Sequence, residues 1–100
     1  MSIHCNDIGT IFRCTIYDEN GDIVDISTAS GIYIIFKLPN FTSTIKTASF
    51  YTDGTDGVLQ YIAESGDISL SGQWSMQAKI VMPSGTWFSD ITKFTVCENL

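Results

Sequence analysis

The 100-residue sequence is poor in charged residues, in leucine and in alanine, and it has no long apolar run. Charged residues make up 16% of the chain and hydrophobic residues 44%, the reverse of the composition of a disordered chain. No apolar stretch approaches the roughly 18 to 20 residues that span a bilayer, and residues 1–7 lack the basic end and apolar segment of a secretion signal. We therefore expect one folded domain over residues 1–100, with no membrane span and no secretion signal of its own.

Positive charge is also scarce, with five Lys and Arg against eleven Asp and Glu and a net charge of -6. Neutralisation of phosphates requires clustered cations, whereas the basic residues here are scattered singly along the chain. They are Arg13, Lys37, Lys46, Lys79 and Lys93. The sequence therefore predicts that nucleic acid is not a partner.

The common signatures of catalytic and cofactor sites are missing. The chain has no G-x-S-x-G, H-E-x-x-H or C-x-x-C pattern and no glycine-rich phosphate loop. The single histidine, His4, precedes Cys5, and neighbouring residues on a strand point to opposite faces, so the two cannot act as nucleophile and base. We predict no enzymatic activity, no metal site and no cofactor.

Acidic residues form two groups around turn signals. The first contains Asp18, Glu19, Asp22 and Asp25, and the second contains Asp53 and Asp56. Calcium requires about six to eight converging oxygen ligands, and the first group lacks the D-x-[DN]-x-[DN]-G order of a calcium loop. Both groups carry the Asp, Asn and Gly that turns require, so they are interpreted as turns.

The three cysteines cannot all pair with one another. Cys14 belongs to the apolar, inward set of its segment, whereas Cys97 belongs to an outward set with Lys93 and Thr95. The sequence therefore predicts free thiols in a reducing compartment. Cys5 with Cys97 is the single pair that stays open, because first and last strands are often neighbours in sandwiches.

β-Branched residues dominate what is present. Fourteen Ile, eleven Thr and four Val stand against four Leu and four Ala, a choice that favours pleated sheet. Alternating segments are expected as strands over residues 3–5, 10–18, 23–26, 31–38, 45–51, 58–62 and 73–82, with a return through 87–88 to 94–96. Asn20-Gly21 is a hairpin signal between two of them, and residues 63–71 are a connection with room for one helical turn. About seven to eight short strands predict an all-β, immunoglobulin-like two-sheet antiparallel sandwich.

The alternation also predicts one shared core. Its members are Phe12, Cys14, Ile16, Ile34, Phe36, Trp74, Met76, Ala78, Ile80, Phe94 and Val96. Trp87 and Phe88 are neighbours, so one of these two rings should be exposed. That ring, together with Tyr33 or Tyr51, is the candidate anchor of a protein interface, because buried aromatic residues carry much of the energy of such contacts.

A series of turn and core motifs follows a particular order along nearly the whole chain. They are Asp7-Ile8-Gly9, Asp18 to Ile26, Ile34-Ile35-Phe36-Lys37-Leu38-Pro39, Asp56-Gly57-Val58-Leu59-Gln60-Tyr61, Gly72-Gln73-Trp74-Ser75-Met76-Gln77-Ala78, Pro83-Ser84-Gly85 and Phe94-Thr95-Val96. From about Asp7 to Val96 the sequence resembles the N-terminal immunoglobulin-like domain of phage baseplate upper proteins and similar small tail or head appendage proteins.

The resemblance implies a role in the particle of a tailed phage, assembled in the host cytoplasm. Such domains anchor receptor-binding or fibre components and repeat around a symmetric hub, so homo-oligomers and other phage structural proteins are the implied partners. Further segments carry host recognition in baseplate upper proteins, whereas this chain ends at Leu100, so a structural or adaptor role is expected. The alternative that stays open is a carbohydrate-binding module for host recognition.

Overall fold

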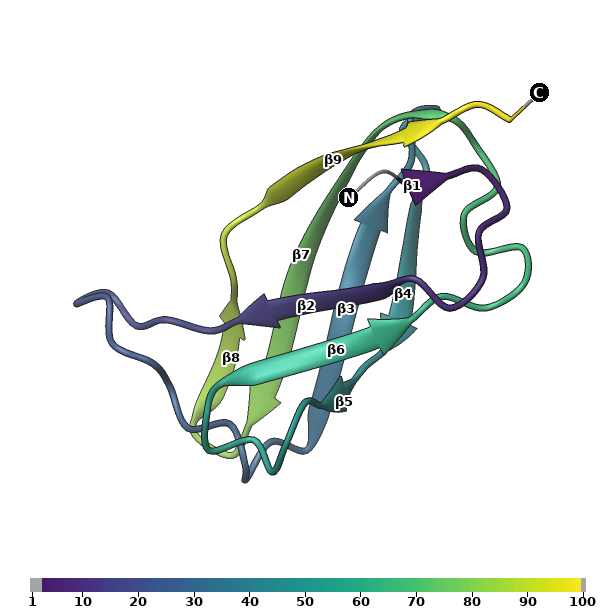
Figure 1. Ribbon diagram of the computed structural model, residues 1–100. Coiled ribbons are helices and arrows are strands. Elements are labelled where there is room, and N and C mark those ends of the chain that lie inside the picture. The colour runs from purple at the N-terminus through teal and green to yellow at the C-terminus, as the bar shows by residue number, and fades with distance from the viewer. Residues whose placement is uncertain (1–2, 100) are drawn as a thin grey trace.

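The computed structural model describes residues 3–99, which form nine strands in two sheets and contain no helix (Figure 1). The strands are β1 (Ile3–His4), β2 (Ile11–Thr15), β3 (Gly31–Lys37), β4 (Ser43–Thr47), β5 (Ser49–Phe50), β6 (Val58–Ile62), β7 (Gly72–Met82), β8 (Gly85–Phe88) and β9 (Thr92–Cys97). The all-β prediction is confirmed, with two sheets facing each other across one core.

The larger sheet has six strands in the order β1-β9-β7-β3-β4, with β8 also paired to β7. The eleven-residue strand β7 is its centre, because β3 pairs along one side while β9 and β8 share the other side. The smaller sheet has the order β2-β6-β5. All pairs are antiparallel except β1 with β9, so the large sheet is mixed, and the expectation of purely antiparallel sheets is wrong at this pair.

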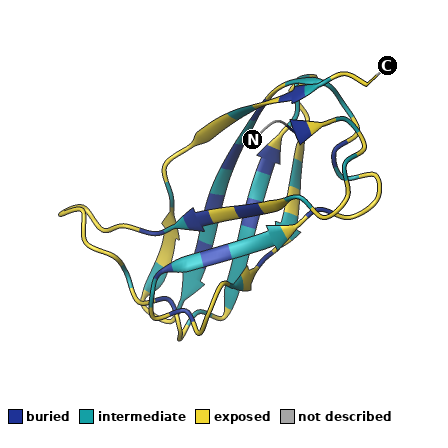
Figure 2. Cartoon of the chain, viewed as in Figure 1, coloured by how far each residue is buried: buried dark blue, intermediate teal, exposed yellow. Residues whose placement is uncertain are grey.

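The core lies where the two sheets meet, and it follows the predicted alternation. Along β7, Trp74, Met76, Ala78 and Ile80 are buried (Figure 2). All the predicted core residues are buried except Phe94, which is half-buried and packs against the rest. The ring centroids of Phe94 and Trp74 lie 5.9 Å apart, within the range of favourable aromatic contacts.

A one-residue bulge interrupts the strand that runs from β8 into β9. Met76 pairs with Thr92 and Lys79 pairs with Phe88, so three residues, 89–91, face the two residues 77–78. The Ser89 hydroxyl accepts a hydrogen bond from the Ala78 N–H at 2.8 Å and holds the bulge against β7. Because side chains alternate along a strand, the extra residue exchanges the inward and outward sets between β8 and β9.

Two segments differ from the sequence-based expectation. No strand forms over residues 23–26, because the hairpin after β2 is reduced to one bridge between Tyr17 and Ile23. The segment 45–51 is divided at the buried Ala48, so that β4 pairs with β3 in the large sheet and β5 pairs with β6 in the small one. Strands that pass between sheets in this way form the corners of sandwiches. Residues 65–67 form a turn.

Candidate interaction surface

His4 and Cys5, the two residues weighed for catalysis, make separate contacts. The His4 side chain is exposed, and its backbone N–H donates to the Asp7 carboxylate at 2.9 Å. The Cys5 thiol donates to the Ser69 carbonyl oxygen. Within residues 3–99, no group of three or more His, Cys, Asp or Glu side chains is placed to hold a metal ion.

The thiols are unpaired, and their surroundings differ. Cys5 directly follows β1, and its N–H donates to the carbonyl oxygen of Cys97 at the end of β9. Cys5 packs against the core, whereas Cys97 follows the buried Val96 and so lies on the other face of its strand. Burial raises the pKa of the Cys14 thiol to about 11, which keeps it protonated and unreactive near neutral pH.

The acidic residues around the second turn carry out the turn chemistry expected of them. The Asp53 carboxylate accepts hydrogen bonds from the Thr55 hydroxyl and N–H, which lower its pKa. Asp56 accepts from the Thr52 hydroxyl and the Val58 N–H. These oxygens therefore stabilise the 51–58 turn itself.

The four candidate aromatic residues fall on three different surfaces. Tyr33 and Phe88 lie on the outer face of the large sheet, in one row with Lys79 between them. Tyr51 belongs to the small sheet's side, where the Arg13 guanidinium stacks 4.1 Å from its ring centroid. The structure therefore brings together Tyr33 and Phe88 and separates them from Tyr51.

Trp87 and Phe88 are both exposed, by 40% and 53%, so the expectation of a single exposed ring is wrong. Trp87 pairs with the buried Ile80 and thus faces the inner side, as strict alternation requires. However, β8 is an edge strand and the Trp87 ring lies over the backbone of Gly85, so it stays partly in solvent. Strand alternation therefore places Trp87 on the correct face. How much of its ring is covered at an edge strand depends on tertiary packing.

A row of polar side chains crosses the outer face of the large sheet. Lys37 on β3 lies opposite Ser75 on β7, and Ser75 lies opposite Lys93 on β9. One strand separates the two lysines, so their backbones are about 10 Å apart. Among residues 3–99 the single ion pair is Lys46 with Asp67, which leaves Lys37 and Lys93 without a carboxylate partner. We call Lys37, Ser75 and Lys93 the lysine row.

Shallow hollows flank the lysine row on both sides, and both are lined partly by apolar side chains. One hollow, of about 350 Å³, includes Pro39 and Phe41, and the other, of about 360 Å³, includes Ile35 and Ile91. Phe41 is 81% exposed and Ile91 is 61% exposed. The row is thus a pair of cations set between two apolar depressions.

Charge is segregated between the strands and their connections. All five basic residues lie in strands, namely Arg13, Lys37, Lys46, Lys79 and Lys93. All eleven acidic residues lie outside the strands. A chain with a net charge of -6 therefore carries a sheet face that has Lys37, Lys79 and Lys93 and no acidic residue.

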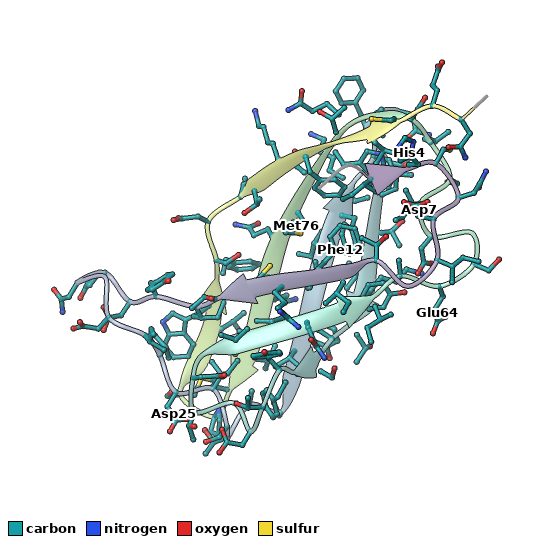
Figure 3. The ribbon with its side chains drawn as sticks, viewed as in Figure 1. His4, Asp7, Phe12, Asp25, Glu64 and Met76 are labelled. Atoms are coloured by element: carbon teal, nitrogen blue, oxygen red, sulfur yellow. The ribbon has the colours of Figure 1, made fainter. Side chains whose placement is uncertain are left out.

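The segment of residues 17–25, which we call the acidic arm, has the opposite charge to this sheet face. It extends away from the two sheets (Figure 1) and rejoins them near Asp25, labelled in Figure 3. The Asp18 carboxylate accepts from the N–H groups of Asn20 and Asp22, which closes the tip of the arm. After the arm, the buried Ile26 donates its N–H to the Gly54 carbonyl oxygen and anchors the chain.

A second polar group closes the side of the sandwich between β4 and β6. Lys46 lies opposite Ile34, so it faces inward, and its ammonium group pairs with Asp67 at 3.0 Å. The Tyr61 hydroxyl donates to the same carboxylate. Burial, and then the hydrogen bond to Asp67, raise the pKa of Tyr61. Burial alone would raise the pKa of Asp67, but the bonds from Tyr61, the Glu64 N–H and Lys46 together lower it.

Comparisons with known proteins add no family to this geometry. No family model matches the chain, and comparison with curated proteins gives no significant match. Within residues 3–99 there is no helix with the length and hydrophobicity required to cross a bilayer.

The lysine row was missed at the level of sequence because its members are far apart along the chain. One feature of the sequence could have indicated it, namely that Lys37, Lys79 and Lys93 all occupy outward positions in the alternation of their strands. Parity places each on the outward face of its strand, but the pairing of β3, β7 and β9 is needed to place two of them in one row.

Proposed function

We propose that the protein is a non-enzymatic structural or adaptor module of a tailed-phage virion, with an immunoglobulin-like sandwich, acting by protein-protein assembly in a baseplate, tail or head appendage. The resemblance from about Asp7 to Val96 supports the phage context, and the two-sheet all-β architecture is compatible with it. Homo-oligomers and other phage structural proteins are the partners that this role requires, and the host cytoplasm is where it would assemble.

The observation that carries the proposal is the outer face of the large sheet. Stable interfaces combine apolar area with polar groups, and this face offers partly apolar hollows beside two lysines that have no carboxylate partner among residues 3–99. Ile45, which pairs with Ile35 across β4 and β3, adds an apolar side chain that is 60% exposed. Such a face has the composition of a surface that is covered in an assembly.

Purified particles produced from the genome that encodes this chain test the proposal directly. We expect mass spectrometry to detect the chain in fixed proportion to other virion proteins, and an antibody against it to label one structure of the particle. Light scattering at tens of micromolar should also show an oligomer or a stable complex with a virion protein. Absence from washed particles, together with a strictly monomeric mass, would overturn the proposal.

One hollow keeps a carbohydrate-binding module as a second candidate function. It lies between β2 and the bulge, and its lining includes Tyr17, Phe88, Arg13, Asp18 and Asp90. Aromatic residues beside carboxylates suit the stacking and hydrogen bonding of a sugar. Binding on a glycan array that is lost in Tyr17→Ala and kept in Tyr51→Ala would favour this candidate over assembly.

A further inference from the structure

We propose that the acidic arm of one copy docks on the lysine row of a second copy, so that the chain assembles head to tail with itself. The inference rests on the proposed function in that both require association, and it names the two surfaces and the partner. The arm is the occupant, and the lysine row with its two hollows is the receiving surface.

The charges of the two surfaces are complementary. The arm carries Asp18, Glu19, Asp22 and Asp25 and no basic residue, while the face carries Lys37, Lys79 and Lys93 and no acidic residue. The Asp18 carboxylate is engaged in closing the tip. Glu19 and Asp22 are exposed at that tip, which provides two carboxylates for the two lysines of the row.

The apolar groups also correspond. Tyr17 and Ile23 form the bridge at the base of the arm's tip, and each is 56% exposed. The lysine row lies between hollows lined by Phe41 on one side and Ile91 on the other. An arm with apolar side chains behind its carboxylates can therefore fill the hollows while Glu19 and Asp22 reach the ammonium groups. Charge alone would give a weak exposed contact, whereas this combination removes apolar surface from water.

The arm and the lysine row are separate surfaces of one molecule, which determines the type of assembly. The base of the arm, at Tyr17 and Asp18, shares a hollow with Asp90 and Thr92 beside β9, while the arm itself extends away from the sheets (Figure 1). Among residues 3–99, neither Lys37 nor Lys93 forms an ion pair with a carboxylate of its own copy. Different patches on one molecule make a heterologous contact, so each added copy still presents a free arm or a free row. Such contacts produce rings when they close and filaments when they do not.

Charge reversal on each surface tests the inference, with sedimentation velocity of the full chain at low salt as the measurement. The arm variant combines Glu19→Lys with Asp22→Lys, and the face variant combines Lys37→Glu with Lys93→Glu. We expect each variant alone to associate about tenfold or more weakly than the parent chain. Mixing the two should restore association, because the reversed arm of one then matches the reversed face of the other.

A matched control separates local complementarity from net charge. Glu64→Lys with Glu98→Lys changes the net charge as much as the arm variant does, at exposed positions outside both surfaces, and should leave association unchanged. Added salt should weaken association of the parent chain, because exposed charges are screened. Thermal unfolding of every variant checks that the fold is kept, and duplex DNA is included as a competitor for the lysines.

The results of these experiments distinguish failure of the arm-to-row contact from failure of the proposed function. Loss in both reversed variants with recovery in the mixture supports the inference. Association that both reversals leave intact overturns it while assembly stands. A monomeric parent chain that binds another virion protein through the lysine row also overturns it and again keeps the proposed function. A monomeric parent chain whose lysine row binds duplex DNA overturns it in favour of a nucleic-acid surface.

Discussion

The two faces of the six-stranded sheet are built from the same strands but have opposite compositions. On β7 the inner face presents Trp74, Ala78 and Ile80, all within the core, and the outer face presents Ser75 and Lys79. The inner face stabilises the fold and tolerates little change, because cores are close-packed. The outer face contributes little to that packing and is free to vary. Strand parity thus separates the face that stabilises the fold from the face that we propose takes part in association, and substitutions at neighbouring positions can test the two separately.

The strongest test of this comparison is a truncation on the inner face. Ile34 on β3 is fully buried, so Ile34→Ala should lower the free energy of unfolding by about 2 to 5 kcal/mol through lost burial and a residual cavity. Urea denaturation followed by circular dichroism measures the change. A loss below about 1 kcal/mol would mean that the two sheets are not packed against each other at this position.

A smaller effect is expected at the polar group that closes the sandwich edge. Asp67→Asn removes the negative charge that accepts the Tyr61 hydrogen bond and pairs with Lys46. We expect it to lower the free energy of unfolding by about 1 to 3 kcal/mol near neutral pH. Because the native pKa of Asp67 is lowered, its contribution is present above the ordinary pKa of an aspartate and is lost as pH falls through the native value.

The pH dependence provides the matched measurement for this variant. Unfolding free energies taken from neutral pH down to about pH 3 should fall more steeply in the parent chain than in Asp67→Asn. Parallel curves would show that the Asp67 carboxylate is not engaged with Tyr61 and Lys46 in solution. Tyr61→Phe keeps the ring in the core and tests the hydroxyl bond separately.

The outer face should respond differently to a similar change. Ile45 is 60% exposed, and Ile45→Thr keeps the β-branched shape, so the free energy of unfolding should change by no more than about 0.5 kcal/mol. The same substitution removes apolar surface beside the hollows and should weaken association in sedimentation experiments. A large loss of stability would contradict the separation of the two faces.

The smallest effect on stability is expected from reducing agents. All three cysteines are free, so reductant should leave the melting temperature unchanged, whereas loss of a native disulfide would cost about 2 to 5 kcal/mol. Mass spectrometry after brief alkylation near pH 8 should show modification at Cys5 and Cys97 well before Cys14, since burial keeps the Cys14 thiol protonated. Early modification of Cys14 would indicate that β2 opens readily.

The inner face could be predicted from the sequence because burial imposes a period of two. The segment containing Trp74 alternates without interruption from Gln73 to Ile80, and both Trp74 and Phe36 lie in the core as expected. Ala48 was harder, because a strand that passes between sheets keeps its alternation while its partners change. The bulge at Ser89 was also out of reach, since one extra residue leaves no mark in composition and shows itself only in the register with β7.

The candidate surface could be predicted only in part. The sequence indicates one ring of Trp87 and Phe88, together with Tyr33 or Tyr51, and the structure puts Phe88 and Tyr33 in one row. The basic residues are scattered along the sequence, but three of them lie on the same face of the folded sheet. Lys37 and Lys93 become near neighbours only when β3 and β9 flank β7, and that pairing depends on contacts distant in sequence.

The parallel pair of β1 and β9 has a consequence for how the chain folds. It joins Ile3 to Val96, so its hydrogen bonds close a loop that contains all the remaining strands, β2 to β8. Closing so long a loop costs entropy that only an already assembled sandwich can offset, whereas the β7–β8 hairpin closes over a two-residue turn. We therefore expect hairpin contacts early in folding and the docking of β1 last, with amide hydrogens in β1 exchanging faster than those in the middle of β7. The first strand in chain order would be among the last to become native.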